Sequence, residues 1–220
     1  MAVLSFDATG ERFYETGAKN AVFYPLTSSG TYGTGVAWNG LTGVTHSPEG
    51  AEPTDLWADD MKYATMRSAE NFNCTIEAYN YPTEFNKCNG VGTLIEGAYV
   101  GQQTREPFGL SYITQVGNDV SQEVAQKLHL LYGLTASPSE LAYATINDSP
   151  EAVTMSWECT STPVAVTGFD ATSEITLDSR DLSEEAWAAL IEKLHGGSST
   201  EATLPLPDEI KSIITTADAA

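Results

Sequence analysis

Basic residues are scarce in this chain, and that scarcity is its most informative property. The 220 residues include 10 Lys and Arg against 30 Asp and Glu, which gives a formal net charge of −20 at pH 7. The ten bases stand singly and form no cluster. Proteins that bind DNA or RNA need a basic surface to neutralise the phosphates. The composition therefore predicts a chain that repels nucleic acid, and the simplest reading of its charge is solubility.

Cysteines and long apolar runs are also lacking. The three cysteines, Cys74, Cys88 and Cys159, are odd in number and have no metal-ligand spacing, so we expect reduced thiols in a cytosolic product. Cys74 lies on an apolar strand face, where a small buried residue is expected. No apolar run approaches the roughly 18 residues of a membrane span. The N-terminus has neither the basic start nor the apolar stretch of a secretory signal. We expect no membrane association.

Recognisable catalytic motifs are missing as well. The chain has three histidines, His46, His129 and His195, but no G-x-S-x-G motif whose serine one of them could activate as a base. It also has no phosphate-binding loop, no dinucleotide-binding fingerprint and no pair of Cys or His at the spacing of a zinc site. A carbohydrate-cleaving enzyme could use two carboxylates, but nothing in the sequence singles out such a pair among the thirty Asp and Glu residues. We predict no enzyme activity and no catalytic, cofactor or metal site.

Short alternating runs between turn residues predict a mainly β fold. In the run 72–79, Phe72, Cys74, Ile76 and Ala78 share one face, which is therefore expected to be buried. In the run 152–160, Val153, Met155, Trp157 and Cys159 share a face in the same way. Strands are predicted at 21–25, 36–41, 72–79, 108–115, 127–134, 152–160, 163–167 and 173–178. The run 36–41 is read as one strand with a glycine kink.

One helix is predicted, at about 183–195. Ser183 can cap it, Glu184 and Glu185 suit the positive end of its dipole, and Gly196 can close it. Trp187, Leu190, Ile191 and Leu194 form a stripe at helical spacing, so the helix should lie against a sheet.

Two terminal arms flank the predicted β domain. Residues 1–20 are polar with little periodicity, and 21–196 would form the domain. Residues 197–220 begin with a flexible linker composition and continue into Leu204, Pro205 and Leu206, where prolines favour an extended backbone. This apolar segment could contact a neighbouring subunit or lie on its own domain.

A long connection at about 43–70 separates two of the predicted strands. A short strand is possible at 61–67, but 43–60 has no core pattern. Connections beyond about 12–15 residues are uncommon in compact domains and tend to bind something or be disordered. Leu56, Trp57 and Tyr63 favour binding, because disordered segments are poor in aromatics. We predict that these three residues are buried against another molecule; the alternative is that Trp57 folds back on its own domain.

Taken in order, a series of segments resembles the major tail (tail tube) proteins of long-tailed, non-contractile bacteriophages. The similarity runs from about residue 12 to 208. Its segments are GVAWNGLT (35–42), SPEGAE (47–52), LWADDMKY (56–63), TIEAY (75–79), YPTEF (81–85), GQQTR (101–105), FGL (108–110), ATINDSPEA (144–152) and TMSWE (154–158).

The resemblance implies a tail-tube β-sandwich or barrel of two packed antiparallel sheets with one flanking helix. It also implies self-assembly into six-membered rings that stack into a tube, where long loops and terminal arms bridge rings and genome DNA passes through the hole. Partners would be further copies of the chain and other tail proteins: tape measure, tail terminator and tail tip. The chain would be made in the host cytoplasm and end in the virion. Six copies at −20 each carry −120, which would let DNA slide without sticking.

An independent binding module of a virion, carbohydrate-binding or adhesin-like, is the alternative. It would also be β-rich and acidic, but it should stay monomeric and bind a glycan. A tube protein should form long polymers with an axial hole.

Overall fold

The computed structural model describes residues 4–50, 52–145 and 152–219. The strands of the main sheet are β1 (Tyr14–Pro25), β2 (Val36–Ala37), β3 (Leu41–His46), β8 (Asn73–Ala78), β11 (Phe108–Gly117), β12 (Ala125–Ala136), β13 (Met155–Ser161) and β16 (Glu174–Asp178). Smaller two-stranded ladders pair β4 (Glu49–Gly50) with β7 (Glu70–Asn71), β5 (Pro53–Ala58) with β6 (Met61–Arg67), β9 (Gly92–Ile95) with β10 (Ala98–Val100), and β14 (Val164–Val166) with β15 (Phe169–Thr172). The helices are the short 3₁₀ helix η1 (Thr83–Lys87), α1 (Glu184–His195) and α2 (Pro207–Ala217).

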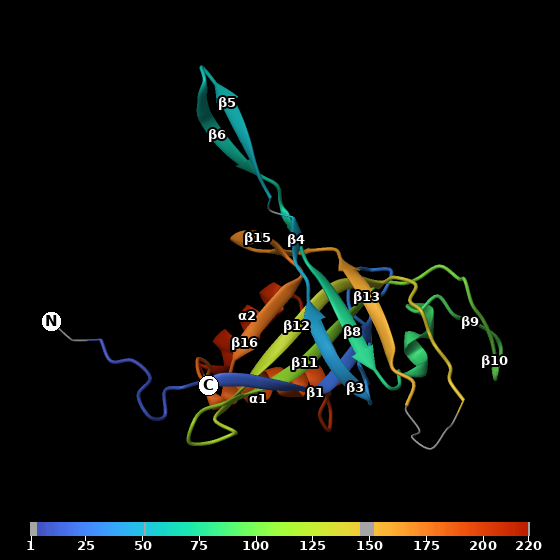
Figure 1. Cartoon of the computed structure of the whole chain (residues 1–220). Helices are drawn as coiled ribbons and strands as arrows, with labels where there is room; N and C mark the ends of the chain where they lie inside the picture. Colours follow the sequence, from blue (N-terminus) through green and yellow to red (C-terminus); the bar gives the residue numbers. More distant parts are fainter. Residues whose placement is uncertain (1–3, 51, 146–151, 220) are drawn as a thin grey trace.

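The main sheet is antiparallel and has the strand order β2-β1-β11-β12-β13-β8-β3, with β16 also paired to β12. It bends so that β13, β8 and β3 lie over the layer of β1, β11 and β12, and the two α-helices lie on one side of the molecule (Figure 1). The predicted class, a mainly β sandwich with a flanking helix, is confirmed, although the two layers belong to one sheet and a second helix is present.

Strand β12 joins the two layers. Its residues 127–131 pair with β16, and its residues 134–136 pair with β13. Gly133 lies between these stretches at a φ of +58°, and a Cβ there would overlap the backbone oxygen of Thr162. Only glycine accepts this conformation and this close approach, so Gly133 is where the strand changes partners.

Aromatic side chains fill the space between the two layers. Phe85, from η1, is fully buried, and its ring centroid lies 4.7 Å from that of Trp38 and 5.2 Å from that of Phe108. The predicted inward faces of 72–79 and 152–160 are confirmed where they meet this core, at Cys74, Ile76, Ala78, Trp157 and Cys159. Alternation along the strands therefore specified which side chains enter the sandwich.

A second core lies between the sheet and the helices. Helix α1 has the predicted bounds: the Ser183 hydroxyl accepts a hydrogen bond from the Ala186 amide, and Gly196 ends the helix at a φ of +81°. Leu190 and Leu194 are fully buried against the sheet, while Trp187 is half-buried. The predicted stripe is thus confirmed as the inner face of α1.

Two sequence boundaries are corrected. The predicted strand 36–41 is two strands, β2 and β3, because the chain turns at Asn39 and at Gly40, where φ is +87°. The predicted arm 1–20 is shorter, since strand β1 begins at Tyr14 and pairs with β11 along its length.

The predicted C-terminal arm folds onto its own domain. Leu204 and Pro205 are buried, Leu206 is half-buried, and the Tyr132 hydroxyl donates to the Pro205 oxygen at 3.0 Å. Helix α2 follows, and Glu209 on it pairs with Lys193 of α1 at 2.9 Å. The expectation that Leu204, Pro205 and Leu206 contact another subunit is therefore replaced by the second placement that the sequence left open.

Candidate functional site

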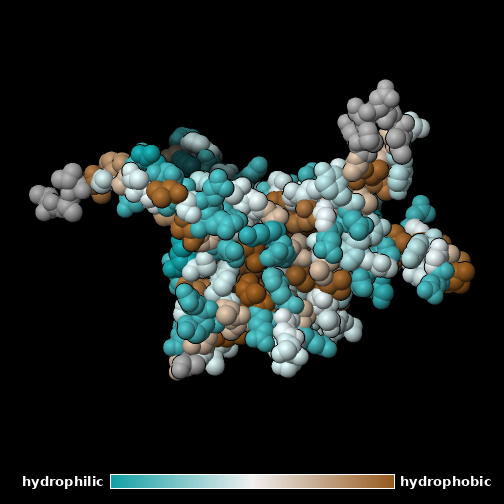
Figure 2. Space-filling view, turned by 90° about the horizontal axis from the view of Figure 1, so that it is seen from below, coloured by the Kyte–Doolittle hydropathy of each residue, from teal (hydrophilic) through white to brown (hydrophobic). Residues whose placement is uncertain are grey.

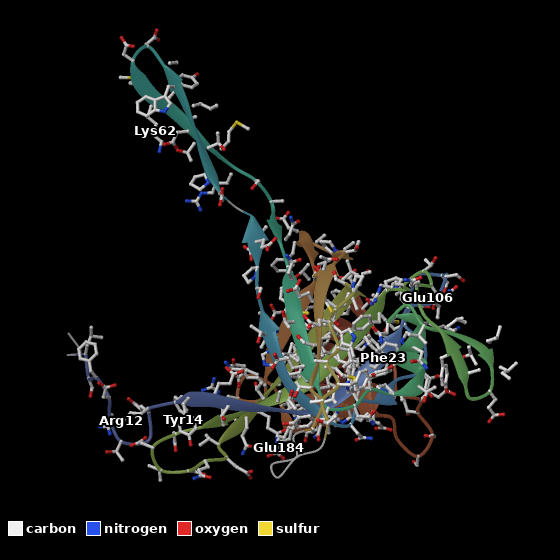
Figure 3. All side chains as sticks on the ribbon, turned by 45° about the vertical axis from the view of Figure 1, so that its right-hand side comes forward. Arg12, Tyr14, Phe23, Lys62, Glu106 and Glu184 are labelled. Atoms are coloured by element: carbon white, nitrogen blue, oxygen red, sulfur yellow. The ribbon has the colours of Figure 1, made fainter. Side chains whose placement is uncertain are left out.

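A thin β-hairpin, β5–β6, projects far from the body of the molecule (Figure 1). All of its described residues are exposed, among them Trp57 at 69% and Tyr63 at 75%. Its side chains point into open space on both faces of the ribbon, as Figure 3 shows around the labelled Lys62. Leu56, Met61 and Met66 are exposed on the same hairpin. A two-stranded ribbon has no interior, so these apolar groups have nothing within the hairpin to cover them.

The hairpin corrects the expectation of an irregular connection at 43–70. The possible strand 61–67 is confirmed as β6, and β5 pairs with it through a two-residue turn. Asp59 and Asp60 form this turn at φ values of +51° and +59°, the conformation that Asp and Asn tolerate best after glycine. Asp55 supports the ladder by pairing with Lys62 at 2.7 Å and accepting from Thr65 at 2.9 Å. The Asp-Asp pair between alternating runs was the signal that could have predicted this hairpin.

Two further projections carry exposed apolar side chains. Leu4 and Phe6, on the N-terminal segment that precedes β1, are 78% and 79% exposed. Leu94 and Ile95, at the end of the β9–β10 hairpin, are 71% and 68% exposed. Figure 2 shows apolar surface on projections at opposite sides of the body. Sequence reasoning singled out neither pair.

Leu56, Trp57 and Tyr63, the predicted contact residues of the connection, are thus brought together on one exposed ribbon. Leu204, Pro205 and Leu206 are not part of this surface. The three cysteines are free and buried, as was expected for Cys74.

A polar cluster, here called the root cluster, lies where β3 ends and the chain leaves for the hairpin. It consists of His46, Tyr112, His129, Glu174 and Glu15. The Tyr112 hydroxyl lies 2.6 Å from Nε2 of His46, and Nδ1 of His46 lies 3.2 Å from Oε1 of Glu174. The same Oε1 lies 3.9 Å from Nδ1 of His129, whose ring stacks on Tyr112 at a centroid distance of 4.7 Å. One carboxylate oxygen of Glu174 therefore faces two imidazoles.

The other side of His129 connects to strand β1. Nε2 of His129 lies 2.9 Å from the Thr114 hydroxyl and 3.3 Å from Oε1 of Glu15. Glu15 also accepts from Lys127 at 2.7 Å. The root cluster thus ties together strands β1, β3, β11, β12 and β16.

The electrostatics of the root cluster favour a charged Glu174. Hydrogen bonds from His129 and His46 lower the pKa of Glu174 to about 2, against the opposing effect of its partial burial. Burial raises the pKa of Tyr112, and the carboxylate of Glu174 raises it further. Burial raises the pKa of Glu15, but the hydrogen bonds from Lys127 and Thr114 outweigh it, so the net pKa is lowered. Tyr112 therefore keeps its proton and can donate it to Nε2 of His46, and Nδ1 of the same ring lies in position to donate to Glu174.

Sequence reasoning treated His46 and His129 one at a time and missed this cluster. His46 and Tyr112 are 66 residues apart, and no local pattern links them. Among the described residues, no group of three His, Cys, Asp or Glu side chains has the geometry to hold a metal ion. Within the same residues, no helix has the length and apolarity to cross a membrane.

Likenesses to known proteins are found among solved structures. No protein-family model matches the chain, and no curated protein matches it. Among solved structures it is similar to a chain of the six-fold symmetrised cryo-EM structure of the anti-feeding prophage (AFP) baseplate. The two are 10% identical, the match covers 79% of this chain and 97% of that chain, and the TM-score is 0.37.

Proposed function

We propose that this chain is a structural protein of a phage tail, and that copies of it assemble into six-membered rings that stack as the tail tube. The order of the segments between residues 12 and 208 supports the family, as a resemblance. The β-rich body with thin projections suits a subunit that makes contacts at a distance from its own core. In this proposal the chain is not an enzyme. It assembles into rings and tubes and contacts other tail proteins.

The observation that carries the proposal is the exposed apolar surface of the β5–β6 hairpin. Trp57, Met61 and Tyr63 are each more than 60% exposed on a ribbon that cannot fold back to cover them all. Large exposed apolar groups gathered on one element mark surfaces that bind another molecule. A second copy is the partner that a tube supplies at every subunit. The hairpin reaches well beyond its own body (Figure 1), which suits contact with such a copy.

The charge of the hairpin region constrains what it can contact. Between residues 49 and 71 the chain has six acids, of which Asp59 and Asp60 occupy the tip, and only two bases, Lys62 and Arg67. The surface that receives the hairpin must therefore accept apolar side chains while the acids stay in solvent or meet bases. Each added subunit brings a formal charge of −20, so association works against repulsion that salt screens.

The same charge fits a conduit for DNA. Acids on the wall of a hole would repel the phosphates, so the genome would pass without binding. A wall lined mainly by Lys and Arg in the assembled tube would contradict this part of the proposal.

A carbohydrate-binding or adhesin-like module remains the alternative, because exposed aromatic side chains can also stack on sugars. The two proposals differ in stoichiometry. The tube requires copies of this chain to contact one another, whereas the module requires a glycan and leaves the chain monomeric.

Negative-stain electron microscopy and sedimentation of the purified chain, over a range of concentrations and salt, test the proposal. We expect long polymers with an axial hole and six-fold symmetry in end views. Folded protein that stays monomeric at every concentration and salt tested would overturn it. Glycan-array binding by such a monomer would instead establish the module.

A further inference from the structure

The two strands that carry the hairpin leave the body at one place. Strand β3 ends at His46, and the returning chain re-enters through Phe72 into β8. The rings of His46 and Phe72 lie edge to face with centroids 5.1 Å apart, and the Ser47 amide donates to the Asn73 oxygen at 2.8 Å. Whatever holds His46 and Phe72 therefore sets the direction in which the hairpin departs.

Backbone pairing holds this exit point from one side only. Strand β3 is the last strand in the sheet order and pairs with β8 alone among the described residues. Its other edge has no backbone partner there to fix its position. Leu41 and Val44 of β3 pack against the core, and at the exit point itself the His46 side chain ties β3 to the opposite layer, through Tyr112 of β11 and Glu174 of β16.

The returning strand is held by the residue next to Glu174. The Ser161 hydroxyl donates to the Phe72 oxygen at 2.6 Å, and the Ser173 hydroxyl lies 2.8 Å from Ser161 Oγ. Ser173 and Glu174 are consecutive, so the start of β16 is connected to both strands of the exit point. On the other side, Glu174 reaches His129 in the middle of the sheet.

We propose that Glu174 is a latch: its carboxylate holds His46 directly and reaches His129 through the Thr176 hydroxyl, and this bridge fixes the orientation of the projecting hairpin, which is released when the bridge is broken. Glu174 is a positioning residue, since it acts on the hairpin through His46. The latch concerns the single folded chain. Only its consequence for assembly rests on the proposed function.

Other charged and titratable groups face the side chains of the latch and could form competing hydrogen bonds or ion pairs with them. Tyr112 and His129 face it from β11 and β12, Glu15 faces His129 from β1, and Cys74 is the register partner of His46 on β8. Lys127 is occupied by Glu15 at 2.7 Å. Beside its imidazoles the cluster therefore contains two carboxylates and one ammonium. The Glu174 carboxylate lies within hydrogen-bond distance of Nδ1 of His46, at 3.2 Å, and of the Thr176 hydroxyl, at 3.4 Å. Nδ1 of His129 lies 3.9 Å from that carboxylate and 3.2 Å from the same Thr176 hydroxyl.

Replacing Glu174 with Gln tests the latch without a large change in volume. The uncharged amide oxygen is a weaker acceptor for Nδ1–H of His46 than the carboxylate is, and the NH₂ group of the amide cannot accept at all. Glu15→Gln is the matched control, because Glu15 belongs to the same cluster but contacts His129 and not His46. His46→Gln breaks the same bridge from β3 and leaves β16 intact, so it replaces E174Q as the test if that variant does not fold.

Two measurements on the full-length chain, below the concentration at which it associates, decide the outcome. Hydrogen exchange should quicken at least tenfold at the Ser47 amide in E174Q and in H46Q, with core amides of β11 and β12 unchanged. Distances between spin labels on the hairpin and on the body should broaden in the same variants. E15Q should match the wild type in both. Exchange at Ser47 and label distances equal to wild type in a folded E174Q or H46Q would overturn the latch.

The latch and the proposed function fail in different ways. If wild-type chain never polymerises while E174Q frees the hairpin, the latch stands and the tube does not. If wild-type chain forms tubes while the exit point of E174Q is unchanged, the tube stands and the latch is wrong. If both hold, E174Q should polymerise more slowly than E15Q, because the freed hairpin must be ordered again on binding.

Discussion

Replacing Trp57 with Ala gives the most direct test of the hairpin as an assembly surface. A tryptophan buries about 150–250 Å². Because Trp57 is 69% exposed in the single chain, roughly 100–170 Å² is left for a partner to cover. At about 25 cal/mol per Å² this contributes about 2.5–4 kcal/mol per subunit, of which alanine would retain a small part.

A loss of about 2–3 kcal/mol per contact corresponds to a roughly 30–150-fold weaker association. The assay is the concentration of chain that remains in the supernatant after polymers are pelleted. We expect this critical concentration to rise by that factor in W57A. The thermal unfolding of the single chain should stay almost unchanged, since substitutions of exposed residues usually alter stability by less than about 0.5 kcal/mol.

Phe169→Ala is the control for exposure alone, because Phe169 is 82% exposed but lies on the β14–β15 hairpin. Its critical concentration should remain within a few-fold of wild type. Normal tubes from W57A at the wild-type concentration would refute the reasoning. An equal loss in W57A and F169A would show that the β5–β6 hairpin has no special part.

Three further outcomes follow from the charge, from Gly133 and from Glu174. Tube assembly should strengthen as salt rises, because subunits of formal charge −20 repel one another, and tubes that disperse between low and moderate salt would contradict this. Gly133→Ala should destabilise the fold by about 2–4 kcal/mol in urea denaturation, since the φ of +58° and the overlap with the Thr162 oxygen both oppose a Cβ, and an unchanged midpoint would refute the role of this glycine. The pKa of Glu174 falls from 4.5 to about 2 on folding, so its contribution to stability is complete above pH 4.5 and is lost as the pH falls toward 2. The stability difference between wild type and E174Q should therefore shrink between pH 5 and pH 3, and a constant difference would exclude the charge of Glu174 as its cause.

The repeating patterns of the sequence predicted the elements that depend on near neighbours in the chain. Alternation placed Cys74, Ile76 and Trp157 inside the sandwich, because successive side chains of a strand point to opposite faces. Helix α1 followed from Ser183 and Gly196, because capping is decided by groups within a few residues of the helix end. Helix α2 was missed, since the prolines before it indicated an extended segment. Pro207 instead occupies the first helical position, where its missing N–H costs nothing.

The sequence likewise predicted one part of the candidate site and missed another. Leu56, Trp57 and Tyr63 were identifiable as apolar residues without a core pattern, and the structure places them together on an exposed ribbon. That this ribbon is a hairpin depended on a left-handed turn at Asp59 and Asp60, a local signal that was present but not used. Whether those side chains contact another copy stays a prediction.

By itself, the sequence determined the acidic charge, the strand faces and the capped helix, because each arises from composition or from residues close together in the chain. Only the tertiary structure decided that Leu204 enters the core of its own chain, and that Glu174 meets both His46 and His129. Those contacts join strands that are distant in sequence. Their partners are fixed by how the sheet bends at Gly133 and by which edges face each other, and no spacing of residues along the chain encodes that geometry.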